Sequence, residues 1–221
     1  MTVTNPDLQS AGLTNAFTYV APQTISFVRA SAATPAATAA AVTVAYSGAQ
    51  TAGDLNVIVI GWNTPSATVQ SVRDSLGNAY NLAIGPTVGT GRAQAIYYAP
   101  NITAGNNSVT VTFTTTVSTI DVRVLEYRGV STLDIARGAS GSGGSANSGA
   151  GTTTTANELI VGADTVATLT TGAGSGFTSR IITSPNGDIA EDRIVKATGS
   201  YSATASLNGS GAWVMQMVTF K

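Results

Sequence analysis

The stretch "GDLNVIVIGW" at residues 53–62 decides the fold class, because it is apolar on both faces of an extended strand. A continuous apolar run of this length, bounded by turn residues, is typical of a strand in mid-sheet that is covered on each side. A second such run, "WVMQMVTF", occupies 213–220. Between them, β-branched and aromatic runs alternate with turn signals such as "DSLGN" (74–78) and "SPNGD" (184–188), which supply the Gly and Asn of tight hairpins. The sequence therefore predicts an all-β, antiparallel β-sandwich.

The chain also repeats its own order of strands. The series "GDLNVIVIGW", "AIYYA", "NSVTVTF", "TIDVRVLEY" is matched later by "NELIVGA", "RIVKA", "YSATASL", "AWVMQMVTF". Two similar halves, each too small to bury its own apolar face, indicate a jelly-roll-like sandwich of two interleaved Greek keys. We place this sandwich at 23–221 and its halves at about 42–136 and 152–221. The seam "RGASGSGGSANSGAG" (137–151) fits a flexible linker or a strand of small residues equally well.

The composition excludes several classes of function. The chain of 221 residues has 10 Lys and Arg, 11 Asp and Glu, and neither Cys nor His. With so few cations there is no basic surface for phosphates, so nucleic acid is not an expected partner. The absence of Cys and His removes thiol nucleophiles, the commonest general base and the commonest zinc ligands. We therefore expect neither an enzyme nor a bound cofactor.

The N-terminal sequence and the composition of the chain indicate where the protein is located. No run of 18 apolar residues is present, and Met1 is not followed by a leader pattern, so neither membrane insertion nor a signal peptide is expected. The abundance of Thr, Ser, Ala, Gly and Asn, with lysine only at Lys196 and Lys221, is more usual in secreted proteins and virion parts. We expect an extracellular or cell-surface location, or a phage virion if Met1 is the native start.

Residues 2–20, "TVTNPDLQSAGLTNAFTYV", resemble the closing hairpin of an IPT/TIG domain, an immunoglobulin-like module. Leu8 stands where the turn of that hairpin usually carries glycine. From about residue 24 the chain is similar to jelly-roll-like modules of large bacterial surface proteins, through "GWN", "VRDSLGNAY", "IYYAPNITAGNNSVTVTF", "VRVLEYRG" and "NELIVGA". The resemblance implies an orphan Ig-like hairpin at 1–22 followed by an extracellular β module, and it names no ligand.

The orphan hairpin raises the question of what covers its apolar side chains. A lone hairpin is marginally stable in water, and a sheet edge offers it unpaired backbone groups. We expect the segment to pair with its own sandwich or with another copy, and head-to-tail pairing between copies would give a filament. The apolar residues assigned to this assembly contact are Val3, Leu13, Phe17 and Tyr19.

Acidic residues suggest two weak sites. Asn186, Asp188 and Asp192 could offer oxygens to calcium, against the alternative of a solvated turn that leads into a strand. Glu126 shares a strand face with apolar residues, so it is expected to point inward and to need a cation, with Arg180 or Arg193 as candidates.

A further interpretation concerns sugar binding, because aromatic faces stack on sugar rings. The candidate residues are Trp62, Asn63, Tyr80 and Tyr98, whereas Trp213, inside the last apolar run, is assigned to the core. One preferred hypothesis and two alternatives remain. The preferred one is a non-catalytic structural or adhesive subunit whose partners are other copies of itself or neighbouring domains. The alternatives are a polysaccharide-binding module and a phage virion structural protein.

Overall fold

The computed structural model describes residues 2–4, 6–7, 10–12 and 24–221. These residues form eighteen strands and no helix, which confirms the all-β prediction. Within the same described residues there is accordingly no helix that is long and apolar enough to cross a membrane.

Two short paired strands are described within the segment 1–22 for which a hairpin was predicted. Strand β1 (Thr2–Thr4) pairs antiparallel with β2 (Ser10–Gly12). Of the four assembly residues, Leu13, Phe17 and Tyr19 lie outside the described residues, and for Val3 only the backbone is described. Their proposed contact therefore stays a prediction.

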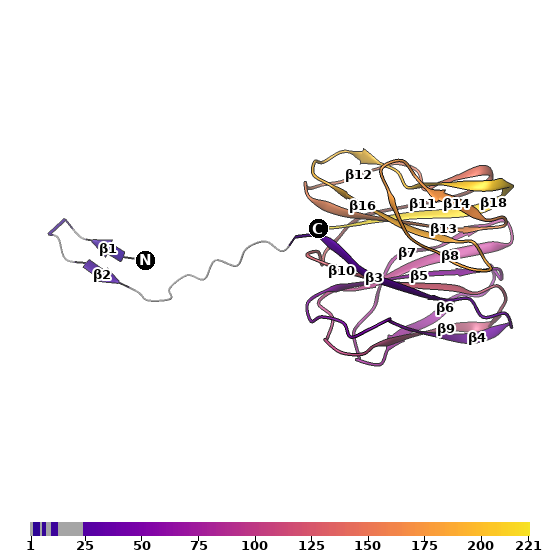
Figure 1. Cartoon of the computed structure of the whole chain (residues 1–221), viewed down its shortest axis with the longest axis horizontal. Coiled ribbons are helices and arrows are strands. Elements are labelled where there is room, and N and C mark those ends of the chain that lie inside the picture. The colour runs from indigo at the N-terminus through magenta and orange to yellow at the C-terminus, as the bar shows by residue number, and fades with distance from the viewer. Residues whose placement is uncertain (1, 5, 8–9, 13–23) are drawn as a thin grey trace.

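Strands β3 to β10 form an eight-stranded unit, the first roll (Figure 1). Its large sheet has the order β3-β10-β5-β8-β7 and its small sheet the order β4-β9-β6. All the pairs are antiparallel. The bounds are β3 (Ser26–Ala33), β4 (Ala39–Ala45), β5 (Leu55–Trp62), β6 (Val69–Asp74), β7 (Asn81–Gly89), β8 (Arg92–Ala99), β9 (Ser108–Val117) and β10 (Asp121–Arg128).

Strands β11 to β18 form the second roll. Its large sheet has the order β11-β18-β13-β16-β15. On the outer side, β12 pairs with β17, and β14 pairs with the first part of the long strand β18. The bounds are β11 (Leu133–Asn147), β12 (Gly151–Thr152), β13 (Glu158–Val166), β14 (Thr170–Ala173), β15 (Thr178–Ile182), β16 (Ile189–Val195), β17 (Ser200–Tyr201) and β18 (Thr204–Phe220).

The large sheets of the two rolls share one strand order. When the strands are numbered within each roll, both large sheets read first, eighth, third, sixth, fifth. This alternation between two sheets is that of a jelly roll, so the jelly-roll-like prediction holds and the motif occurs twice. The expected interleaving is wrong, because each large sheet takes its strands from one roll only. Eight strands are enough for each half to build two sheets and a core of its own.

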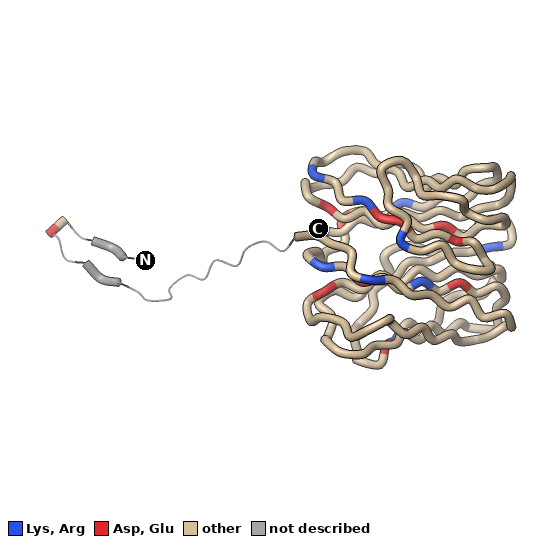
Figure 2. Tube along the Cα trace, viewed as in Figure 1, with Lys and Arg blue, Asp and Glu red and all other residues tan. Residues whose placement is uncertain are grey.

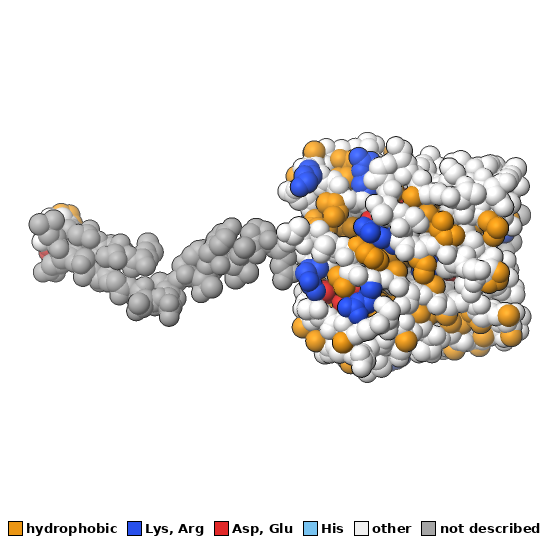
Figure 3. All heavy atoms as spheres, in the orientation of Figure 1, with side chains coloured by type: hydrophobic (Ala, Val, Ile, Leu, Met, Phe, Trp, Pro, Cys, Tyr) orange, Lys and Arg blue, Asp and Glu red, His pale blue; other side chains and the backbone are white. Residues whose placement is uncertain are grey.

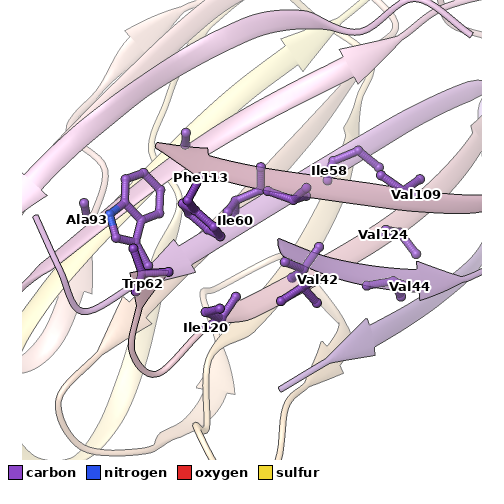
Figure 4. Close-up of a cluster of buried hydrophobic side chains, with 14 of the residues drawn as sticks. Val42, Val44, Ile58, Ile60, Trp62, Ala93, Val109, Phe113, Ile120 and Val124 are labelled. Atoms are coloured by element: carbon purple, nitrogen blue, oxygen red, sulfur yellow. The ribbon is translucent and has the colours of Figure 1, made fainter. Parts of the chain in front are cut away.

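The rolls stack through their large sheets, which gives three apolar layers (Figure 1). The first core lies between the sheets of the first roll, and Figure 4 shows Ile58, Ile60 and Trp62 in it. The neighbouring residues Val57 and Val59 point the other way, into the inter-roll layer between the two large sheets. Strand β5 is therefore buried on both faces, as predicted. A second core lies on the outer side of the other large sheet.

The small-residue seam is a strand, not a linker. Strand β11 covers most of 137–151, and the rolls meet earlier, at 129–132. Gly141 lies opposite Trp213, and a Cβ there would come 2.5 Å from the indole. A small residue is needed at position 141 because the indole of Trp213 lies directly alongside.

Candidate functional site

Many of the charged residues lie on strands on either side of the plane where the two rolls meet (Figure 2). Several of them are fully enclosed, although charged residues are rarely buried unless they are paired. We call the polar side chains buried between the large sheets, together with the half-buried Thr87, the inter-roll network; its other members are Arg92, Gln94, Asp121, Arg123, Thr165, Thr183, Asp188 and Gln216.

Arg123 is the centre of this network. It lies on β10, is 0% exposed, and its Nε is 2.9 Å from Asp121 Oδ1. Its Nη1 donates to two carbonyls of the second roll, Asp164 O at 2.8 Å and Ile189 O at 2.5 Å. The other oxygen of Asp121 accepts a hydrogen bond from Thr183, also in the second roll. One ion pair of the first roll is thus bonded to three points of the second.

Two glutamines extend these contacts. Gln94 Nε2 on β8 donates to Ala163 O at 2.8 Å and to Gln216 Oε1 at 3.2 Å. In return, Gln216 on β18 donates from Nε2 to Gln94 O at 2.9 Å and to Thr87 Oγ1 at 2.8 Å. Thr165 Oγ1 donates to Gln94 Oε1 at 2.7 Å. Because both amides have partners across the layer, the relative position of the rolls is fixed by directional bonds.

Burial changes the acidity of the surrounding groups. It raises the pKa of Asp164 to about 6, although hydrogen bonds from Thr170 and Ile189 oppose the rise. Burial and the neighbouring Asp121 raise the pKa of Asp188 well above its ordinary value. Burial also lowers the pKa of Arg92, against the charges of Asp188 and Asp164. Burial therefore favours the neutral forms of Asp164, Asp188 and Arg92 relative to the same groups in water.

The four sugar-binding candidates do not form one site. Trp62 is 0% exposed, packs edge-on against Phe113 at 5.5 Å and donates from Nε1 to Thr64 O and Ala67 O, so it has no free face. This corrects its assignment as a ligand residue: its place in the strand alternation directs it into the first core. The side-chain oxygen of its neighbour Asn63 is buried without a partner. Trp213, assigned to the core, is partly exposed beside the second core.

The two tyrosine candidates have structural partners as well. Tyr80 donates to Asp74 Oδ2 at 2.9 Å and accepts from Asn56 Nδ2 at 3.1 Å. Tyr98 lies in the inter-roll layer with its ring 5.4 Å from that of Phe220. Tyr98 pairs with Val57 near the opposite end of β5 from Trp62, roughly 17 Å along the strand. The candidates are therefore separated in space.

The calcium candidates do not converge either. Asp188 Oδ1 accepts from Val166 N at 2.9 Å, and Asp192 Oδ2 is 2.8 Å from Arg180 Nε. Asn186 Nδ2 donates to a carbonyl of the first roll, Ile120 O, at 3.2 Å. In the residues that the structure describes, no group of three His, Cys, Asp or Glu side chains could hold a metal ion.

Glu126 points inward, as predicted, but its cation was predicted wrongly. It is 0% exposed and its Oε2 is 2.8 Å from Arg29 Nε on the neighbouring strand β3. Arg180 instead pairs with Asp192. Burial raises the pKa of Glu126, while the Thr51 amide and the Arg29 charge oppose the rise.

Sequence reasoning missed Arg123, Gln94 and Gln216. A signal for two of them was present: Arg123 and Gln216 each stand inside the apolar last strand of a roll, four residues before Tyr127 and Phe220, respectively. When two apolar strands carry a polar residue at the same position, that residue is expected to be buried and to have a hydrogen-bond partner across the buried layer.

Gly61→Ala tests how closely the rolls must approach at this network. A Cβ on Gly61 would come 2.3 Å from Thr165 Oγ1 of the other roll. We expect the free energy of unfolding to fall by about 1–2 kcal/mol, because overpacking displaces Thr165 from Gln94. Urea unfolding measures the change. Gly144→Ala, where a Cβ would have nothing within 4 Å, is the control. Equal effects of the two substitutions would contradict the prediction.

Comparison with known proteins adds no assignment: no family model, no curated protein and no solved structure matches the chain.

Proposed function

We propose that this protein is a non-catalytic structural module of an extracellular assembly, a double jelly roll that serves as a rigid building block and joins other copies through its N-terminal strands. The observation that carries the proposal is the inter-roll network. Arg123, Asp121 and Gln94 are enclosed and bonded across the layer, so their chemistry is used to lock one roll onto the other. A block fastened in this way resists shear between its halves.

The low density of charge on the surface also supports the proposal of a structural module. On the face shown in Figure 3, most of the surface is uncharged polar side chain or backbone, and charged groups are few and lie mainly toward the end that bears the C-terminus. Low charge density favours close approach of copies, because few charges must be desolvated or matched. The resemblance of the chain to bacterial surface modules supports an extracellular setting.

The backbone hairpin β1–β2 supplies the means of assembly in this proposal. Each of its two strands has one paired and one open side within this two-stranded sheet. An open strand side adds readily to a sheet edge, with backbone hydrogen bonds for affinity and alternate side chains for specificity.

Light scattering and electron microscopy of the full chain, compared with a chain that begins at Gln23, test this proposal. We expect the full chain to form head-to-tail assemblies and the shortened chain to be monomeric with an unchanged melting temperature. Val3→Asp should abolish assembly, and Thr4→Asp, which adds the same charge at the next position of β1, should weaken it far less because successive strand residues face opposite sides. Monomers of the full chain and of the shortened chain would refute self-assembly.

A further inference from the structure

Three reactive side chains meet at one corner of the second roll. Asp134 lies on β11, Glu158 begins β13, and Lys221 follows β18, which is the strand between the other two. The register places them side by side, because Leu133 and Leu159, the neighbours of Asp134 and Glu158, both lie opposite Phe220.

Lys221 is held in place by its backbone. Its N donates to Thr132 O at 2.9 Å, and its O accepts from Ser131 N at 3.1 Å and Thr132 N at 2.9 Å. From this fixed position Nζ comes 2.6 Å from Asp134 Oδ1 and 2.9 Å from Thr154 Oγ1. The amine is thus positioned against the Asp134 carboxyl group by a strand end that cannot easily turn away.

The Asp134 carboxyl is enclosed and oriented. Its side chain is 3% exposed, Thr154 N donates to Oδ2 at 2.7 Å, and Thr154 Oγ1 donates to Oδ1. Burial pushes the pKa of Asp134 upward, but hydrogen bonds from Lys221 and Thr154 outweigh it and hold the pKa below its usual range. The ground state is an ion pair, and one proton transfer along the Nζ–Oδ1 hydrogen bond converts it into a free amine beside a carboxylic acid.

Glu158 supplies a second carboxyl with one unused oxygen. It is 0% exposed, and its Oε1 accepts from Thr155 N at 3.0 Å and from Thr155 Oγ1 at 2.8 Å. Oε2 is buried and has no hydrogen-bond partner among the described residues, and the nearby Glu158 helps to hold the pKa of Asp134 low. A buried carboxyl so placed is suited to carry a proton to and from its neighbour.

We propose that Lys221 and Asp134 condense to an intramolecular amide, which covalently joins the first and last strands of the second roll. The neutral Nζ attacks Cγ of the protonated Asp134 carboxyl group. Glu158 takes a proton from the nitrogen and returns it to the leaving hydroxyl, so that the C–N bond forms, a C–O bond breaks and one water departs. Carbon and nitrogen keep their oxidation states, so no oxidant or reductant is needed.

The first roll provides an internal comparison. Arg128 is the last residue of β10 and comes directly after Tyr127, as Lys221 comes directly after Phe220, and it pairs with Asp54 at 3.2 Å. The β3 position opposite Arg128 holds Ser26 rather than an acid. A guanidinium stays protonated and is a poor nucleophile, so this corner can only remain an ion pair. The reactive arrangement is a property of the second roll.

Mass spectrometry of the intact, folded full chain tests the proposal directly. We expect a mass lower than that of the sequence by one water. Trypsin should then release peptide 129–137 joined to peptide 197–221. Lys221→Arg keeps the ion pair but removes the nucleophile, so it should show the full sequence mass and two separate peptides. Circular dichroism should give the same strand signal for both proteins.

Glu158→Gln tests the proton carrier and should slow or abolish the linkage in a protein that still folds. A wild-type chain that keeps the full sequence mass after prolonged incubation overturns the proposal, as does a water loss that persists in Lys221→Arg. Linkage in Glu158→Gln at the wild-type rate overturns the role of Glu158. The mass readout does not depend on assembly through the N-terminal hairpin, so it stands or falls separately from the proposed function.

Discussion

Arg123→Met is expected to lower the free energy of unfolding by about 3–5 kcal/mol, because it removes one partner of a fully buried ion pair and leaves the other uncompensated. Asp121 would lose the guanidinium at 2.9 Å, and the carbonyls of Asp164 and Ile189 would lose their donor. Methionine fills much of the volume, so the loss would come from charge and hydrogen bonding rather than from a cavity. Urea unfolding followed by tryptophan fluorescence measures it, since Trp62 reports on the first roll and Trp213 on the second.

Arg128→Met is the matched control for this experiment. Arg128 also pairs with an aspartate, Asp54 at 3.2 Å, but its side chain is 41% exposed. Exposed ion pairs contribute about 0–1 kcal/mol, so we expect a small effect. A loss in Arg123→Met no larger than in Arg128→Met would contradict the view that the inter-roll network fastens the rolls. Unfolding in two steps, by contrast, would indicate that the substitution has uncoupled them.

Glu191→Gln is expected to change how stability depends on pH. Glu191 is 0% exposed on β16, where burial raises its pKa from 4.5 to about 7 despite the hydrogen bond from Gly174 N. Because this pKa is raised in the folded state, the contribution of Glu191 to the free energy of unfolding is fully present below about pH 4.5 and is lost as pH rises through about 7. Glutamine cannot ionise, so this loss should disappear in the variant.

The expected size of this change in stability follows from the rise in the pKa of Glu191. Between about pH 5 and about pH 8 the stability of the variant relative to the wild type should rise by about 2–3 kcal/mol. Asp164 and Asp188 also have raised pKa values and titrate in both proteins, and the charge of Asp164 helps to raise the pKa of Glu191, so the difference between the two curves reports Glu191 together with its interaction with Asp164. Chemical unfolding across this pH range provides the curves. Parallel curves would show that the Glu191 carboxyl has the same pKa in the folded and unfolded chains.

Several features of the fold follow from local pattern. Strand β5 could be predicted as a central strand because Val57 and Ile58 are both apolar and neighbouring strand residues face opposite sides. The repeated series of strands predicted two similar halves, and the two large sheets have the same order. What the pattern could not predict is that each half closes its own two sheets, because strand order depends on which distant segments pair.

The side-chain partners depended on those distant pairings. Glu126 was expected to point inward from the face it shares with its strand neighbours, but its cation is Arg29 because β3 lies beside β10 with these two residues in register. The sequence by itself thus determined that the fold is all-β and placed apolar strands such as β5, because alternation is a property of the local backbone, but it left open whether 137–151 is a strand and assigned Trp62 to the wrong surroundings. Only the tertiary structure decided that Trp62 is enclosed, that Arg123 reaches two carbonyls of the other roll, and that Lys221 meets Asp134. Those contacts join residues far apart in the chain, and their geometry is set by strand register and by the stacking of one sheet on another, which no local pattern contains.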